Sequence, residues 1–74
     1  MLQIIRDIVR KVTGKNGITP DTDFVKDLGL NSLEIMSVIS EFEDRFDMTI
    51  PVRDVWKMRK VEDVIVYLEK KGIS

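Results

Sequence analysis

The chain has 74 residues, of which 43% are hydrophobic, so we predict one domain over residues 1–74, near the lower size at which a core suffices without disulfides. It contains no cysteine and no histidine, which excludes a disulfide framework, a thiolate nucleophile and an imidazole base or metal ligand, and argues against an independent enzyme. The net charge of −1 conceals an acidic segment, because residues 23–51 carry seven acidic and two basic side chains.

The first predicted element is an amphipathic helix over residues 2–13. Five apolar residues recur there at helical spacing: Leu2, Ile5, Ile8, Val9 and Val12. Gly14 ends the pattern. This segment lacks the uninterrupted apolar core and cleavage site of a signal peptide, and no segment approaches the roughly 20 apolar residues that span a bilayer. We therefore expect a cytoplasmic protein without stable membrane insertion.

A long loop is predicted over residues 14–30. Its turn-forming residues are Gly14, Gly17, Pro20 and Gly29. We expect one short turn after Pro20, and we expect Phe24, Val25 and Leu28 to hold the loop onto the core. A loop of this length in so small a domain is usually functional.

The start of the second predicted helix is the most informative local pattern. Asn31 followed three residues later by Glu34 fits a capping box, in which each side chain accepts a hydrogen bond from the other residue's backbone amide. Ser32 is then the first helical residue. Its hydroxyl would lie beside unpaired amides and the positive end of the helix dipole, which favour a phosphate by about 0.3–1 kcal/mol. The sequence therefore predicts that a phosphodiester on Ser32 would be well tolerated.

The second helix is predicted to cover residues 32–46 and to be amphipathic. Its apolar face contains Ile35, Met36, Ile39, Phe42 and Phe46. Its polar face contains Glu34, Ser37, Glu41, Asp44 and Arg45.

Two further helices complete the predicted fold. Pro51 suits the start of a short third helix over residues 52–58, in which we expect Trp56 to pack into the core. The fourth helix is marked by the spacing of Val61, Val64, Ile65 and Leu68 and is closed by Gly72. The predicted fold class is all-α: a four-helix bundle, with three main helices and a short third one, and a long loop between the first two helices.

Three segments in this order resemble the acyl carrier protein family. They are residues 24–34 (FVKDLGLNSLE), 42–47 (FEDRFD) and 50–51 (IP), and the likeness spans essentially the whole chain. In that family a serine within an Asp-Ser-Leu core receives a 4′-phosphopantetheine arm from coenzyme A, and Ser32 is the matching position. Asn31 stands where Asp is usual, which keeps the helix cap but makes the local charge one unit less negative.

The resemblance also implies partners and site residues. A phosphopantetheinyl transferase would load Ser32, and acyl-loading and acyl-transferring enzymes of the transferase, ketosynthase and acyl-ligase types would use the thioester carried on the arm. The implied partner-binding residues are Leu33, Glu34, Ser37, Glu41 and Asp44. The implied lining of a deformable acyl pocket between the helices is Met36, Ile39, Val55, Met58, Val61 and Leu68.

Two alternative functions remain open from the sequence. Aminoacyl and peptidyl carriers commonly show a Gly-Gly-His/Asp-Ser-Leu core, whereas residues 29–33 (GLNSL) lack the second glycine and the histidine. A helical interaction domain that carries nothing is the competitor from another class. DNA binding is disfavoured because the second helix is acidic, and no calcium loop or other metal site is predicted.

The charge near the third helix suggests a specialised role. Typical fatty-acid-synthase carriers that this chain resembles are strongly acidic throughout, whereas Arg53, Lys57, Arg59 and Lys60 make this region basic. We therefore expect an acyl carrier of a specialised fatty acid or polyketide-type pathway. We separately expect the chain to be a monomer.

Overall fold

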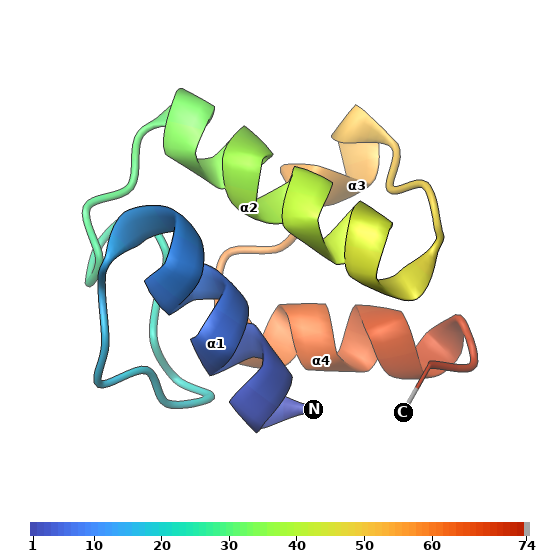
Figure 1. Cartoon of the computed structure of the whole chain (residues 1–74), viewed down its shortest axis with the longest axis horizontal. Helices are drawn as coiled ribbons and strands as arrows, with labels where there is room; N and C mark the ends of the chain where they lie inside the picture. The colour runs from blue at the N-terminus through green and yellow to red at the C-terminus, as the bar shows by residue number, and fades with distance from the viewer. Residues whose placement is uncertain (74) are drawn as a thin grey trace.

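Four α-helices are present in the computed structural model, which describes residues 1–73. They are α1 (Leu2–Thr13), α2 (Ser32–Phe46), α3 (Val52–Val55) and α4 (Val61–Lys70). The α1–α2 connection runs along one side of the molecule, from blue to green in Figure 1. Within residues 1–73 the extended pairing is a single antiparallel bridge between Asp23 and Lys60. The structure thus confirms the predicted all-α bundle with a long loop between its first two helices.

Local signals set the ends of the helices. The predicted bounds of α1 and α2 are confirmed, and each helix ends at a residue with positive φ: Gly14 (76°) after α1 and Asp47 (50°) after α2. A residue in this left-handed conformation stops the helix and lets its own amide bond back to a carbonyl of the last turn. After α4 the left-handed residue is Gly72, with φ of 81°, one residue beyond the cap Lys71, and its amide donates to the Glu69 carbonyl at 3.0 Å. No helix within residues 1–73 is long and apolar enough to cross a membrane.

The third helix is shorter than predicted. It ends at Val55 rather than Met58, and residues 56–57 form a turn. The amide of Trp56 still reaches the Val52 carbonyl at 3.3 Å, but those of Lys57 and Met58 bond to Asp54 and Val55, three residues back. Hydrogen bonds over three residues tighten the last turn of a helix and commonly mark its end.

The core draws apolar side chains from all four helices and from the long loop. The buried residues are Ile5, Ile8, Val9, Ile18, Phe24, Leu30, Val38, Ile39, Phe42, Ile50, Val55, Val61, Val64 and Leu68. Burial of Phe24 and partial burial of Leu28 confirm that they hold the loop on the core. Ile18 and Leu30 are loop anchors that the sequence interpretation did not include.

Two predicted core contacts are wrong. Val25 is 56% exposed, because the turn that begins at Asp23 directs the preceding Phe24 inward and Val25 outward. Trp56 is 52% exposed, because the neighbouring Val55 fills the core position at 3% exposure. Consecutive residues of a helical turn point about 100° apart, so one of two neighbours faces solvent.

Hydrogen bonds order the long loop. The amides of Val25 and Lys26 both donate to Asp23 Oδ1 at 2.8 Å. The Lys26 amide and the Val25 amide stabilise the charged carboxylate, and so the pKa of Asp23 lies below its ordinary value although burial opposes this shift. The Phe24 amide donates to the Arg59 carbonyl at 3.0 Å, which ties the loop to the segment before α4. The loop is therefore a fixed support for the start of α2.

Candidate functional site

Ser32 is the first residue of α2, and a complete capping box surrounds it. The Glu34 amide donates to Asn31 Oδ1 at 2.8 Å, and the Asn31 amide donates to Glu34 Oε1 at 3.1 Å. This confirms the predicted box. The two reciprocal bonds hold the backbone on either side of Ser32, whose own side chain is exposed and takes no part in the cap. The hydroxyl is therefore presented to solvent from a rigid turn.

The backbone before Ser32 is equally constrained. Gly29 adopts a φ of 65°, and its amide donates to the Val25 carbonyl at 3.0 Å. The next amide, that of Leu30, donates to the Phe24 carbonyl at 3.1 Å, and the Leu30 side chain is buried. Glycine suits this point because a side chain would strain the left-handed backbone. The turn therefore brings the chain from the buried Leu30 directly to the exposed start of α2.

The electrostatic setting of Ser32 favours an anion. The first amides of an α-helix have no partner within the helix, and here the cap engages that of Glu34. No hydrogen bond from the amides of Ser32 and Leu33 to residues 1–73 is present. These free donors lie at the positive end of the dipole of a 15-residue helix. A phosphodiester attached to the hydroxyl could accept hydrogen bonds from the amides of Ser32 and Leu33.

The predicted partner-binding residues fall into two groups. Leu33 is 77% exposed, and Ser37 and Asp44 are also exposed. Glu34 and Glu41 are half-buried and already engaged, Glu34 in the capping box and Glu41 in an ion pair with Lys11 of α1, with Nζ and Oε2 3.1 Å apart. Of the predicted partner-binding residues, those open to a partner are therefore Leu33 next to Ser32, Ser37, and Asp44 about three turns further along α2.

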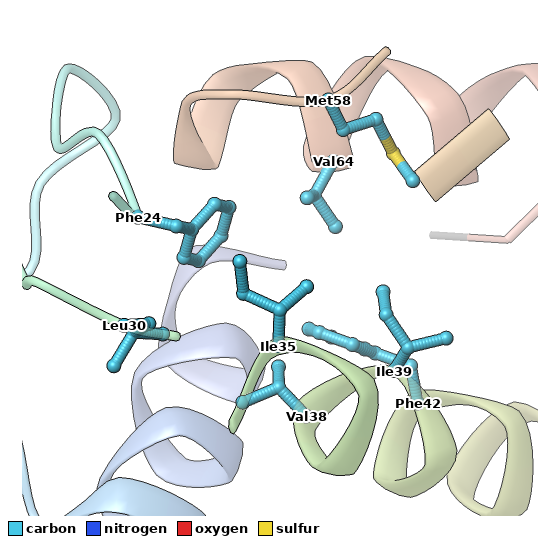
Figure 2. A pocket seen from close by; sticks show the side chains of 8 residues that line it. All are labelled: Phe24, Leu30, Ile35, Val38, Ile39, Phe42, Met58 and Val64. Carbon is cyan, nitrogen blue, oxygen red and sulfur yellow. The ribbon is translucent and has the colours of Figure 1, made fainter. Parts of the chain in front are cut away.

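A small apolar cavity of about 20 Å³ lies between the loop, α2 and α4. Figure 2 shows its lining side chains converging from these segments and, at Met58, from the connection between α3 and α4. The lining consists of Phe24, Leu30, Ile35, Val38, Ile39, Phe42, Met58 and Val64. Such a volume has room for about one water molecule. An acyl chain could enter only if the helices moved apart.

Two of the six predicted pocket residues, Ile39 and Met58, line this cavity. The other four do not: Met36 is half-buried, and Val55, Val61 and Leu68 are buried elsewhere in the core. Val38 was missed although it is spaced three residues from Ile35 and four from Phe42, the helical period that places residues on one face. No local signal marks the contribution of the distant Phe24 and Val64.

Comparison with known proteins completes the description of the site. Residues 3–68 match the family described as phosphopantetheine attachment site. An acyl carrier protein of an Exiguobacterium species is 40% identical over 74 residues, covering 93% of this chain and 94% of the relative. A meromycolate extension acyl carrier protein of Mycobacterium leprae is 37% identical over 68 residues, covering 89% of this chain and 59% of the relative. The crystal structure of an acyl carrier protein from Thermotoga maritima matches with a TM-score of 0.81 and 29% identity, covering 95% of this chain and 84% of that one.

Proposed function

The chain belongs to the acyl carrier protein family, and from this premise we propose that Ser32 is its single attachment point for 4′-phosphopantetheine. Members carry acyl groups on this covalently bound arm, and the chain is a carrier rather than an enzyme. The arm supplies the thiol that forms the thioester, and the chain itself has no cysteine. A phosphopantetheinyl transferase and acyl-handling enzymes are its general partners.

The observation that carries this proposal is the exposed Ser32 hydroxyl within the capping box. The box fixes the backbone, and the free amides of Ser32 and Leu33 offer hydrogen bonds to a phosphate. When the phosphodiester forms, the hydroxyl oxygen bonds to the phosphorus next to the arm in coenzyme A and loses its proton, while the pyrophosphate bond breaks and adenosine 3′,5′-bisphosphate leaves. Glu34 is already occupied by the Asn31 amide, and the chain has no histidine, so the transferase supplies the base. This division of roles agrees with a carrier that is a substrate of other enzymes.

Intact-protein mass spectrometry tests the attachment point. The chain is expressed with a broad-specificity phosphopantetheinyl transferase as wild type, as Ser32→Ala and as Ser37→Ala, a matched control at another exposed serine of α2. We expect the mass of the prosthetic group on the wild type and on Ser37→Ala but not on Ser32→Ala, with equal helical circular dichroism for all three. The group appearing on Ser32→Ala would overturn the assignment.

For the partner enzymes, we propose that they dock on the surface of α2 beside Ser32. Leu33 would be the apolar anchor, with Glu34 and Ser37 near it and Glu41 and Asp44 further along the helix. Charge complementarity acts mainly on encounter rate and specificity, and it weakens as salt increases. The support for Asp44 is its exposure, whereas Glu41 already pairs with Lys11.

Charge reversal separates docking from folding. Asp44→Lys should slow loading by the transferase at low salt, and the difference from wild type should shrink as salt is added. The matched control is Glu69→Lys, an exposed acid near the end of α4. Equal loading rates of Asp44→Lys, Glu69→Lys and wild type at all salt concentrations would mean that the polar face of α2 is only exposed to solvent and has no docking role.

The acyl chain is proposed to lie in an expanded form of the cavity, against Ile39 and Met58, the two predicted pocket residues that line it. The lining is wholly apolar, and each methylene removed from water contributes about 0.8 kcal/mol. A medium-length chain would thus be held while remaining available to an enzyme that binds it better. Met36, Val55, Val61 and Leu68 stay candidates for contacts formed only when the helices separate.

A specialised pathway is the finer proposal. The α3 region carries Arg53 and Lys57, and a partner that grips an all-acidic carrier would meet like charge there. The competition experiment offers the holo protein and a strongly acidic carrier to the malonyl transferase and ketosynthase of general fatty acid synthesis. We expect poor turnover of this chain, and equal turnover of both carriers would exclude the specialised role. We further propose one monomeric domain over residues 1–74, acting in the cytoplasm where coenzyme A reaches the transferase.

A further inference from the structure

The region of α3 exposes two large apolar side chains on one turn. Val52 is 55% exposed and Trp56 is 52% exposed. The Trp56 amide donates to the Val52 carbonyl at 3.3 Å, so the helical geometry continues through Trp56. Residues four apart on a helical turn lie side by side. Val52 and Trp56 therefore form one continuous apolar surface.

Two cations accompany this apolar pair. Arg53 and Lys57 are also four residues apart and both are exposed. The ion pairs within residues 1–73 are Lys11–Glu41 and Arg59–Asp23, so neither cation is paired with an acid of the described chain. We call the four residues Val52, Arg53, Trp56 and Lys57 the α3 patch. It combines an aromatic anchor with two cations that are free to pair with a partner.

The backbone under the α3 patch is held in place. Asp54 faces α4, where its Oδ2 accepts a hydrogen bond from the Tyr67 hydroxyl at 2.8 Å. Val55 is buried in the core, and its amide donates to the Pro51 carbonyl at 3.2 Å. Asp54 and Val55 thus anchor α3, while the four side chains of the α3 patch face solvent. Binding through such a surface requires little ordering of the backbone.

We propose that the α3 patch docks a protein surface that presents carboxylates around an apolar slot, which receives the Trp56 side chain. Tryptophan and arginine are the residues most enriched among those that dominate interface energetics. Carboxylates of the partner would pair with Arg53 and Lys57. This proposal concerns a surface separate from the α2 residues and does not require that Ser32 be the attachment point.

The distribution of charge favours a protein over an extended polyanion. The segment 23–51 has an excess of five acidic side chains, whereas the α3 patch has two cations and no acid. Exposed charges are screened over about 8 Å at physiological salt, so a small acidic patch placed against Arg53 and Lys57 responds mainly to these two cations. Asp54, the acid within α3, is engaged by the Tyr67 hydroxyl. An anionic membrane or nucleic acid presents negative charge over a wider area and would also meet the acidic segment.

Site-specific photocrosslinking identifies the partner. A benzoylphenylalanine replaces Trp56 in one variant of the full chain and Val25 in the control, since Val25 is similarly exposed at 56% but lies in the long loop. Both are irradiated in the native host, and the protein captured at position 56 alone is purified for binding measurements. Capture identifies which protein to purify, and the binding measurement is the test of the proposal.

The binding measurement uses the one tryptophan of the chain as its reporter. On adding the purified partner we expect a blue shift of Trp56 fluorescence, and we expect Arg53→Glu combined with Lys57→Glu to weaken binding about tenfold or more. Reversing the partner's carboxylates to lysine should restore affinity for this double variant. The matched control, Arg10→Glu with Lys15→Glu, changes two exposed cations on another part of the surface and should leave affinity within about twofold.

Several results would overturn the proposal. They are equal capture at positions 25 and 56, capture of a second copy of this chain, equal weakening by the two double variants, and a blue shift with phosphatidylglycerol vesicles in place of the protein. Each variant is also checked for 4′-phosphopantetheine by intact mass. If a variant carries 4′-phosphopantetheine but no longer binds the partner, the α3 patch acts independently of the attachment at Ser32. If wild type itself lacks 4′-phosphopantetheine, that result counts against the proposed attachment and not against the α3 patch.

Discussion

Replacing Asn31 by alanine is the sharpest test of how the start of α2 is built. The change removes Oδ1, which accepts from the Glu34 amide at 2.8 Å, and leaves that amide without its cap. Loss of an N-cap costs about 1 kcal/mol, within a range of about 0.5–2. For a domain of this size such a loss lowers Tm by about 4–8 °C. The Asn31 amide can still donate to Glu34, so we expect partial loss of the box.

Asn31→Asp is the matched variant, because it keeps the acceptor and adds a negative charge at the helix amino terminus. Aspartate caps about as well as asparagine, and its charge at this end contributes about 0.3–1 kcal/mol. We expect Asn31→Asp to be as stable as wild type or slightly more so. Phosphopantetheine loading should slow for Asn31→Ala, in which the backbone at Ser32 frays, and should be retained by Asn31→Asp.

The assay is thermal and urea unfolding followed by circular dichroism at 222 nm, with Trp56 fluorescence as a second probe. Coincident transitions by the two probes would validate the free energies. An unchanged Tm for Asn31→Ala would refute the reasoning, since it would mean that the 2.8 Å bond contributes nothing beyond what water supplies. An equal fall in Tm for Asn31→Ala and Asn31→Asp would likewise contradict the capping explanation.

Three further predictions concern the loop, the α3–α4 contact and the cavity. The pKa of Asp23 is lowered in the fold, mainly by the Lys26 amide, so its charge stabilises the fold above the ordinary pKa of 3.8 and this contribution is lost as pH falls below it. Urea midpoints of wild type and Asp23→Asn should differ at pH 6 and converge on acidification, and a constant difference would contradict this. The pKa of Tyr67 is raised above 10.0 by burial and by the bond to Asp54, so its contribution is complete below pH 10 and declines above it. Tyr67→Phe should lower the free energy of unfolding by about 0.5–1.5 kcal/mol at pH 7. Between pH 9 and 11 the free energy of unfolding of Tyr67→Phe should fall less than that of wild type, and an identical pH dependence would exclude the role of this hydroxyl. Loading an eight-carbon acyl chain should raise Tm above that of the holo form, and Met58→Ala should change this increment whereas Met48→Ala, outside the cavity lining, should not; equal increments would exclude contact between Met58 and the chain.

Local patterns in the sequence were sufficient for the helices and for the start of α2. Gly14 marks the end of α1 because the left-handed conformation that stops a helix suits glycine. Asn31 and Glu34 predict the capping box because both of its hydrogen bonds join residues three apart. Each of these features depends on neighbours in the chain, and so Ser32 could be placed at the first helical position from the sequence alone.

The orientation of side chains in the irregular segments was decided only by tertiary structure. Trp56 and Val55 are both suitable core residues by composition, and the packing of α3 selects Val55 for the interior. Similarly, the turn at Asp23 buries Phe24 and exposes Val25. Periodicity has little force in a turn or a four-residue helix, where one residue of slip changes which side chain faces inward.

Contacts between distant segments likewise could not be predicted from the sequence. The ion pair of Glu41 with Lys11 joins α2 to α1 across 30 positions, and the cavity brings Phe24 and Val64 against α2. The availability of an acid to a partner, and the shape of an apolar cavity, depend on which residues the fold places side by side. Sequence therefore determined that Ser32 lies at the start of α2, whereas tertiary packing determined which neighbouring side chains remain free around it.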